Sequence, residues 1–286
     1  MNNSGILLIN KPVGMSSFFV VKKVRQAFGV KKVGHAGTLD PLACGLMIIA
    51  LGKYTKLCEY LSAKDKIYET TFCLGTKTST DDAEGEIIEQ KNFSHITLTD
   101  LQKAIESFRG KIAQVPPNFS AIKVNGKRAY SLARNNEEIS LKARNIEVFS
   151  IELTKFELPF ISLKIHCSKG TYIRSIARDL GEMLGVGAYA SFIKRTACSN
   201  FNLDQSVELE DLLCSDPHKY FLPNLQITKS FKTLELSLEE KDKIINNQVC
   251  NFKNNQTNEP IALLHGESFI AMLKNSDNKA KVIKFV

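Results

Sequence analysis

The feature that most constrains the fold is an alternation of apolar and polar residues over positions 161–167 (ISLKIHC), followed closely by a helical repeat. Period two is the spacing of a strand with one buried face. After Gly170 and Thr171, apolar residues recur at helical spacing, at Ile173, Ile176, Ala177, Leu180 and Leu184. Together the two patterns predict a strand and an amphipathic helix in an α+β domain with a mixed, mainly antiparallel sheet.

Similar local signals predict the other elements of the main domain. Ser16 and Ser17 offer an N-cap for a helix over 18–28. The stretch 76–86 is expected to be a polar loop, and 115–128 to be extended and rich in turns. We expect strands at 5–9, 46–51 and 66–74, a short helix ending near 62, and a capped helix over 99–108.

The composition changes after about residue 225, where the chain becomes rich in Asn and Lys. This part contains one helix-like segment, 237–246, and short strand-like segments at 261–264, 268–273 and 281–286. The sequence therefore predicts a main domain over 1–225 and a small β-rich module over 226–286.

Positive charge is concentrated in two segments. The net charge is +8, and residues 1–60 and 109–145 each contain eight Lys or Arg against two acidic residues. Clustered cations favour a polyanionic partner, because they neutralise phosphates and release counterions. Charge alone does not exclude a basic protein with no such partner.

Several classes of site and location are disfavoured by missing motifs. The seven cysteines include no C-x-x-C pair, which argues against a zinc site or a disulfide framework. Phosphate-loop, dinucleotide-binding and H-E-x-x-H motifs are absent. We therefore expect no metal and no cofactor. An apolar leader and a run of about 18 apolar residues are also missing, so we expect a cytoplasmic protein without a membrane span.

Four residues stand out as candidates for chemistry, each with a structural alternative. Asp40 follows a glycine-rich turn and is a potential nucleophile, base or ligand, although closing a turn before Pro41 is the commoner role. His35 taken alone is more often structural. Arg174 lies near a helix N-terminus, where a cation is unfavourable, so it either pairs with a buried carboxylate or lies on the surface. Tyr68 is either a core residue or a ring on which a base stacks.

The acidic stretch Asp81, Asp82, Glu84 and Glu86 lacks the spacing of a calcium loop. We therefore expect it to be a solvated acidic turn.

Together these segments resemble the bacterial TruB-type tRNA pseudouridine synthases. The matching blocks, in family order, are GILLINKPVGMSS (5–17), VGHAGTLDPLACGLM (33–47), KIYETTFCLG (66–75), TSTDDAEG (78–85), VPPNFSAIKVNGKRAY (115–130) and CSKGTYIRSIARDLG (167–181). They span nearly the whole predicted main domain, whereas the last sixty residues match far less well.

The resemblance implies a role for each matched position. Asp40 corresponds to the catalytic aspartate, Arg174 to the arginine that pairs with it, and Tyr68 to the tyrosine that stacks on the target base, with a possible acid or base role. The substrate-binding positions implied are His35, which fills the space left by the flipped nucleotide, Tyr172 and Ile193 in the pocket, and the pair Lys11 and Pro12 beside it.

The resemblance also implies the reaction and its partners. The family makes pseudouridine at position 55 in the T-loop of tRNA, an isomerisation that needs no cofactor. The implied partner is the T-stem-loop, gripped by a thumb-like insertion over 109–145 and by a PUA-like C-terminal module. A monomer with no obligate protein partner is expected.

Two other functions are the alternatives to a stand-alone tRNA enzyme. A non-catalytic RNA-binding or tRNA-chaperone protein could dispense with the Asp40, Arg174 and Tyr68 set, which is present here. A guide-RNA-dependent pseudouridine synthase is expected to have terminal extensions, whereas this chain reaches its first motif within about five residues.

Overall fold

The computed structural model describes residues 3–285 except 121, 125, 135–139, 249, 251, 253–258 and 277–278. Part of the predicted 109–145 insertion and the last residue of the predicted strand 281–286 lie outside the described residues. The chain forms two compact units. The first contains Met1–Leu39, Leu46–Ala63 and Ser199–Val286, and the second contains Asp40–Gly45 and Lys64–Cys198.

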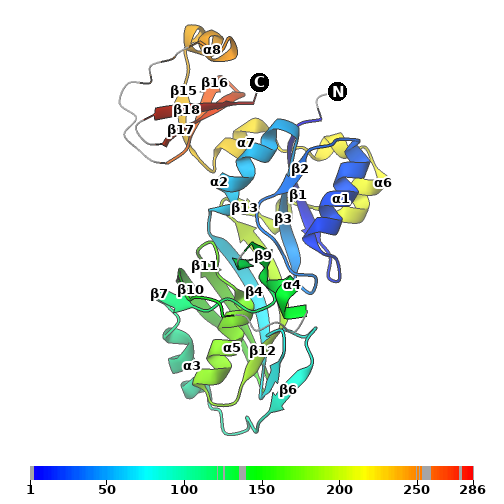
Figure 1. The fold of residues 1–286 in the computed structure, drawn as a ribbon, viewed down its shortest axis with the longest axis vertical. Coiled ribbons are helices and arrows are strands. Elements are labelled where there is room, and N and C mark those ends of the chain that lie inside the picture. Colours follow the sequence, from blue (N-terminus) through cyan, green and yellow to red (C-terminus); the bar gives the residue numbers. More distant parts are fainter. Residues whose placement is uncertain are drawn as a thin grey trace. The chain divides into compact units, whose positions relative to one another are not determined.

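The second unit is built on a sheet with the strand order β12-β4-β11-β10-β7 (Figure 1). Neighbouring strands in this series are antiparallel. The strands are β4 (Lys66–Leu74), β7 (Gly110–Gln114), β10 (Arg144–Glu157), β11 (Phe160–Cys167) and β12 (Ala188–Cys198). Helix α5 (Ile173–Met183) packs against β12, and α3 (Leu98–Glu106) packs against β10. The predicted strand and helix after position 160 are thus present, and the α+β, mainly antiparallel prediction is confirmed.

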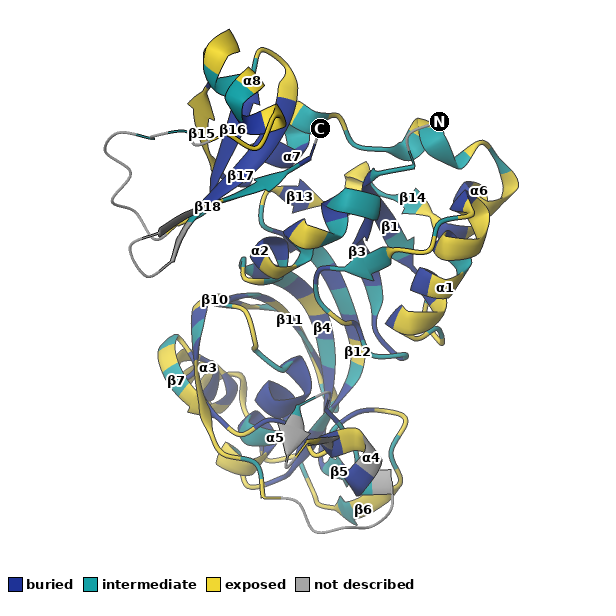
Figure 2. Cartoon of the chain, turned by 45° about the horizontal axis from the view of Figure 1, so that its top comes forward, coloured by how far each residue is buried: buried dark blue, intermediate teal, exposed yellow. Residues whose placement is uncertain are grey.

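Period-two burial determines which residues share a face of this sheet. Tyr68 lies opposite Ile165 on β11 and opposite Arg195 on β12, while Thr70 lies opposite Ile193. Directly opposed residues point to the same face, and all five are buried. The alternation of buried and intermediate residues along β4 and β11 is visible in Figure 2.

The expectation of a polar loop over 76–86 was wrong in two respects. Strand β5 (Thr76–Thr78) pairs with β6 (Ile87–Gln90) as a hairpin, and the turn between them is anchored to β12 by Ala190 N–H donating to Asp81 O at 3.0 Å. Asp82 in this turn is only 3% exposed. The remaining small elements of the unit are β8 (Lys123–Val124), β9 (Lys127–Arg128) and α4 (Ala129–Arg134).

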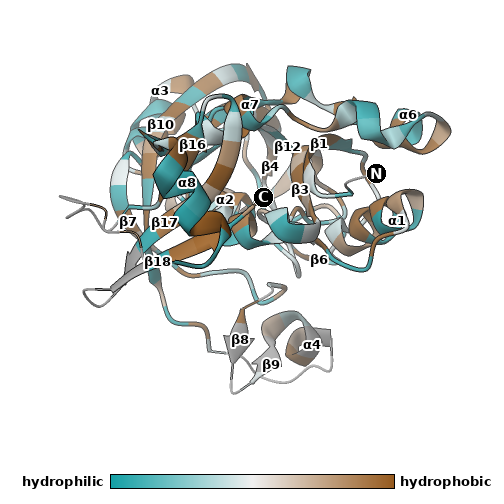
Figure 3. Ribbon diagram, turned by 90° about the horizontal axis from the view of Figure 1, so that it is seen from above, coloured by the Kyte–Doolittle hydropathy of each residue, from teal (hydrophilic) through white to brown (hydrophobic). Residues whose placement is uncertain are grey.

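The first unit contains a second core between a short sheet and helices. Strands β14 (Val207–Glu208), β1 (Gly5–Lys11) and β3 (Cys44–Leu51) are neighbours, and β2 (Val33–His35) pairs with β3. Helix α1 (Ser17–Phe28) begins at the predicted cap, where the Ser16 side chain accepts from Phe19 N–H. Its alternation of hydrophobic and hydrophilic residues is visible in Figure 3, and its apolar face packs with α6 (Leu209–Cys214) in one cluster. Other elements are η1 (Gly52–Leu57), α2 (Cys58–Ser62), β13 (Phe201–Asn202), η2 (Leu203–Gln205), η3 (Pro217–Tyr220) and α7 (Asn224–Thr228).

The C-terminal part of the first unit has its own sheet and core. The order is β15 (Lys232–Glu235), β16 (Ile261–His265), β17 (Ser268–Ser276) and β18 (Lys279–Lys284), with only β15 and β16 parallel. Helix α8 (Leu238–Ile245) contributes Ile244 to the core beneath this sheet. The predicted helix and three strands are present, while β15 was not predicted. No helix in the described residues is long and apolar enough to cross a membrane.

Gly45 determines how closely β3 approaches β12. It has φ +98°, and a Cβ atom built there would lie 2.3 Å from Arg195 O and 2.9 Å from Arg195 N. Neither backbone atom can move without breaking the pairing of Gly45 with Arg195. Glycine is therefore required five residues after Asp40.

Replacing Gly45 by Ala should lower the free energy of unfolding by about 2–4 kcal/mol, because it combines left-handed strain with a backbone clash. Gly110→Ala is the matched control. Gly110 has φ +91° but nothing within 4 Å of a built Cβ, so only the strain of about 1–2 kcal/mol remains. Urea denaturation of both variants measures the difference, and equal losses would contradict the close approach.

Candidate active site

Asp40 lies in a short turn whose backbone is held on both sides. Its carbonyl accepts from Ala43 N–H at 3.1 Å. The preceding residue, Leu39, is bracketed by the buried Ser17 hydroxyl, which accepts from Leu39 N–H and donates to Leu39 O, both at 2.8 Å. Ser17 was expected only as a helix cap. The Asp40 side chain keeps 37% of its surface exposed, so one edge of the carboxylate is open.

Arg174 pairs with Asp40, as the sequence suggested for a cation at a helix N-terminus. Its Nη2 lies 2.9 Å from Asp40 Oδ2, and the Arg174 side chain is only 4% exposed. The surface alternative for this arginine is therefore wrong. Nη1 also donates to Thr80 O at 3.0 Å, and Nη2 to Phe119 O at 2.9 Å.

Asp82 provides a second carboxylate for the same guanidinium. Its Oδ2 lies 3.1 Å from Arg174 Nη1, and its side chain is 4% exposed. Its Oδ1 accepts from the Thr80 hydroxyl and, at 3.0 Å, from Glu84 N–H. The expectation of a solvated acidic turn is thus wrong for Asp82. The position of Arg174 was the only sequence signal for a buried carboxylate, and it did not say which one.

A second arginine on α5 joins neighbouring segments. Arg178 Nη1 lies 3.1 Å from Asp81 Oδ2, and Nη2 lies 2.8 Å from Asp179 Oδ1. Nη2 also donates to Val115 O at 2.8 Å. Burial raises the pKa of the Asp81 carboxyl, and the adjacent Arg178 opposes that effect. Arg174 and Arg178 together tie α5 to the β5–β6 turn and to residues 115–119.

Tyr68 is buried in β4 with 7% of its surface exposed. Burial raises the pKa of its hydroxyl to about 12, while the charge of Arg195 and a hydrogen bond from it act in the opposite direction. Tyr68 is therefore a neutral phenol at neutral pH. Arg195 was not singled out in the sequence, although it is 1% exposed and lies directly opposite Tyr68.

Tyr172 and Ile193 also belong to the second unit. Gln114 fixes the backbone of Tyr172, because its side chain accepts from Tyr172 N–H at 2.9 Å and donates to Tyr172 O at 3.1 Å. Burial raises the pKa of the Tyr172 hydroxyl, and the charge of Asp40 adds to the increase while Arg144 opposes it. Ile193 is 4% exposed on the same sheet face as Tyr68.

The other predicted binding residues belong to the first unit. Lys11 is fully buried, and its Nζ donates to Pro12 O at 2.8 Å and to Met15 O at 2.6 Å. This ammonium therefore braces the turn that follows β1. His35 ends β2 and is partly exposed. Among the described residues, no three His, Cys, Asp or Glu side chains form a group that could hold a metal ion.

Solved structures identify the class of fold. A chain in the structure titled "Crystal Structure of a Cbf5-Nop10-Gar1 Complex" matches with a TM-score of 0.74 and 21% identity, over 99% of this chain and 83% of that one. A chain in "Structure of H/ACA RNP bound to a substrate RNA containing 2'-deoxyuridine" matches with a TM-score of 0.71 and 19% identity, over 98% and 83%. At this identity the likeness concerns the fold.

Sequence comparison identifies the family. The model for the TruB family pseudouridylate synthase N-terminal domain matches residues 25–173, and that for the tRNA pseudouridylate synthase B C-terminal domain matches 174–218. Proteins named tRNA pseudouridine synthase B are 39% identical in Clostridium kluyveri, over 98% of both chains, and 38% identical in Haemophilus influenzae, over 88% of this chain and 84% of the relative. The chain belongs to the TruB family of pseudouridylate synthases.

Asp82→Asn should lower the free energy of unfolding by about 1–3 kcal/mol, because an amide replaces a charged, buried partner of Arg174. Glu86→Gln is the control, since it removes the same charge from an exposed position in the same turn and should stay within about 0.5 kcal/mol of the unmodified protein. Thermal and urea unfolding measure both changes. An unchanged free energy of unfolding for Asp82→Asn would contradict the burial of this carboxylate against Arg174.

Proposed function

We propose that this chain isomerises uridine to pseudouridine at position 55 in the T-loop of tRNA, with Asp40 as the nucleophile. The reaction agrees with the family and with the tRNA named in its relatives. The assignment to Asp40 rests on one observation: two carboxylates pair with Arg174, and they differ in solvent exposure. Asp40 is 37% exposed, whereas Asp82 is 4% exposed with both oxygens occupied.

The reaction requires a charged carboxylate in a shielded site. Pseudouridine formation breaks the N1–C1′ bond, turns the uracil and joins C5 to C1′; C5 loses its proton and N1 gains one, so there is no net redox change. Attack at C1′, attack at C6 and a glycal-type elimination all begin with an ionised carboxylate beside the nucleoside. A guanidinium that stays protonated favours this form and fixes its orientation. Arg174 therefore positions Asp40, and Asp82 positions Arg174.

The substrate uridine must leave its stack to reach Asp40. Tyr68 is proposed to stack on the flipped base, and its neutral phenol suits a hydrogen-bonding or donating role better than that of a phenolate base. Tyr172 and Ile193 are proposed to line the base pocket. His35 is proposed to fill the vacated space in the RNA, with Lys11 and Pro12 beside the site.

The alternatives are less well supported. A non-catalytic RNA-binding protein has no use for an open carboxylate held by a buried arginine. For a guide-RNA-dependent enzyme, the two solved structures offer no support beyond the fold, because they are 19–21% identical, whereas the relatives named for tRNA reach 39% identity over 98% of the chain.

The proposal also covers the domain boundaries, the cellular location and the oligomeric state. We place the catalytic domain at 1–225, with a thumb-like RNA-gripping insertion at 109–145, and a PUA-like RNA-binding module at 226–286. The protein acts in the cytoplasm, where its tRNA substrate is made, as a monomer that needs no obligate protein partner and no cofactor.

Asp40→Asn should abolish pseudouridine formation in an unmodified tRNA transcript, with a rate loss of at least about 10⁴-fold, because an amide cannot supply the charged nucleophile. Binding of the same tRNA should stay within a few fold. Single-turnover assays with mass mapping measure the product, and appreciable turnover would exclude Asp40 as the nucleophile.

Arg174→Lys should slow the reaction by about 100-fold or more, because one ammonium cannot replace a planar group with four partners. Arg178→Lys is the matched control, since Arg178 is on the same helix and pairs with Asp81 and Asp179 rather than Asp40. It should keep its rate within a few fold. Equal rates for the two variants would argue against a role for the Asp40–Arg174 pair.

A further inference from the structure

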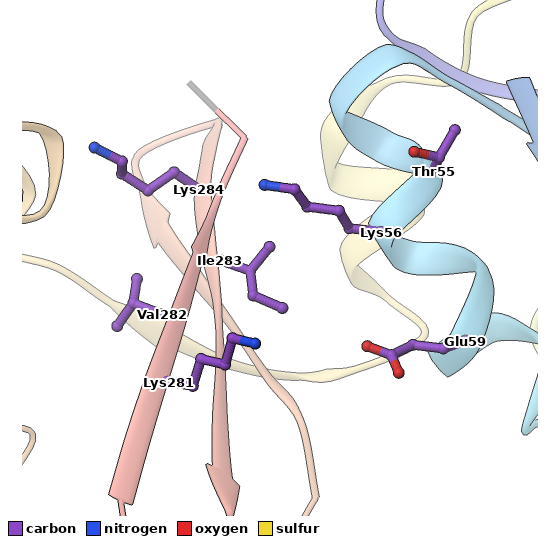
Figure 4. Close-up of a pocket in the computed structure, with 7 residues that line it drawn as sticks. All are labelled: Thr55, Lys56, Glu59, Lys281, Val282, Ile283 and Lys284. Carbon is purple, nitrogen blue, oxygen red and sulfur yellow. The ribbon is translucent and has the colours of Figure 1, made fainter. Parts of the chain in front are cut away.

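A cavity of about 540 Å³ opens in the first unit, and none of its lining residues belongs to the catalytic or binding set assigned above. It is lined by Thr55, Lys56 and Glu59 from η1 and α2, and by Lys281, Val282, Ile283 and Lys284 from β18. In Figure 4, Lys56 and Glu59 extend towards the strand, while Lys281 and Ile283 extend towards the helical segment. This volume lies within the range of small-ligand sites.

The lining is positively charged. The described residues that line the cavity include three lysines and one carboxylate, Glu59. The Lys284 ammonium already donates to Ile245 O and to Asn247 Oδ1, at 2.9 and 2.7 Å. Lys56 and Lys281 are both exposed, so their ammonium groups are available to a ligand.

Two further lysines, Lys274 and Lys53, make the electrostatic potential around the cavity more positive. Lys274 lies directly opposite Lys281 in the β17–β18 pair, so the two side chains share a face. The Lys274 ammonium lies 5.6 Å from the centre of the Tyr60 ring on α2. Lys53 of η1 donates to Phe285 O at 3.4 Å. Like charges directly opposite each other on a sheet are unfavourable, and an anion bound between them relieves that repulsion.

The walls are held in place before any ligand arrives. Tyr54 of η1 packs against Phe285 and Phe269, with ring centroids 5.3 and 6.2 Å apart, and those two phenylalanines stack at 4.7 Å. The Tyr54 hydroxyl donates to Asn224 Oδ1 at 2.7 Å. A preformed cationic hollow loses little entropy on binding an anion.

We propose that this cavity binds a backbone phosphate of the RNA substrate, with Lys56 and Lys281 as the two phosphate ligands. Lysine suits phosphate as a point charge, and the side chain of Ile283 offers apolar contact to the adjoining ribose. The choice of RNA over a free phosphate or nucleotide rests on the proposed function, which supplies a polyanionic substrate. The contact positions the RNA and carries no base specificity.

The test is the affinity of the full-length protein for unmodified tRNA as a function of KCl concentration. Lys56→Gln/Lys281→Gln should raise the Kd about 10- to 50-fold near 0.1 M salt and reduce the log–log salt slope by about 2. The single-turnover rate at saturating tRNA should stay within about 2-fold, because neither lysine belongs to the catalytic set.

Two control variants separate the cavity from a general loss of charge. Lys103→Gln/Lys219→Gln removes the same charge from two exposed lysines that lie outside the cavity lining, the two basic segments and the proposed RNA-binding module, and it should change the Kd by less than about 3-fold. Lys56→Arg/Lys281→Arg keeps both charges and should restore the affinity. Thermal unfolding confirms that each variant is folded.

Two results would overturn the proposal: an equal loss of affinity in the control pair, or no change in the Kd of the glutamine pair. In the second case, calorimetry shows whether the glutamine pair has instead lost binding of inorganic phosphate. That loss would assign the cavity to small phosphates. If the unmodified protein binds tRNA as expected but forms no pseudouridine, the proposed reaction fails while the cavity assignment stands.

Discussion

The site depends on one buried cation. Burying the Arg174 guanidinium is costly unless every donor finds an acceptor and the charge is balanced. Asp40, Asp82, Thr80 O and Phe119 O accept from its two Nη groups, and they come from three separate segments of the chain. Loss of any one of these acceptors leaves a buried N–H donor without its partner, so the contacts that stabilise the fold also hold the proposed nucleophile in place.

The carboxylates of Asp40 and Asp82 are chemically identical, but their surroundings give them different roles in the proposed site. Asp82 accepts from Arg174, from the Thr80 hydroxyl and from Glu84 N–H, and its side chain is only 4% exposed, so it is closed to a substrate. Asp40 accepts from the same guanidinium but remains open on one edge. Exposure rather than residue type therefore distinguishes the proposed nucleophile from the carboxylate that supports it, and preorganisation of this kind lowers the reorganisation needed during reaction.

Much of the fold follows from local patterns, and much of the site does not. The capped helix α1 and the alternating strands β4 and β11 have signals confined to their own residues, so they were predicted close to their observed bounds. Asp82 was misjudged because its neighbours are polar, while its burial comes from an arginine far along the chain. Strand β15 was missed because its four residues are all exposed and carry no alternating burial.

The path of the chain through its two units has a consequence for how this enzyme can be divided. Asp40–Gly45 belongs to the second unit, while the residues on either side of it, Met1–Leu39 and Leu46–Ala63, belong to the first. A fragment covering only the contiguous part of the second unit, Lys64–Cys198, would retain both arginines of α5 yet contain no Asp40. The proposed nucleophile thus lies on a six-residue segment of the second unit that is flanked on both sides by segments of the first. No single cut, gene fusion or domain exchange at the unit boundaries can therefore transfer the complete site.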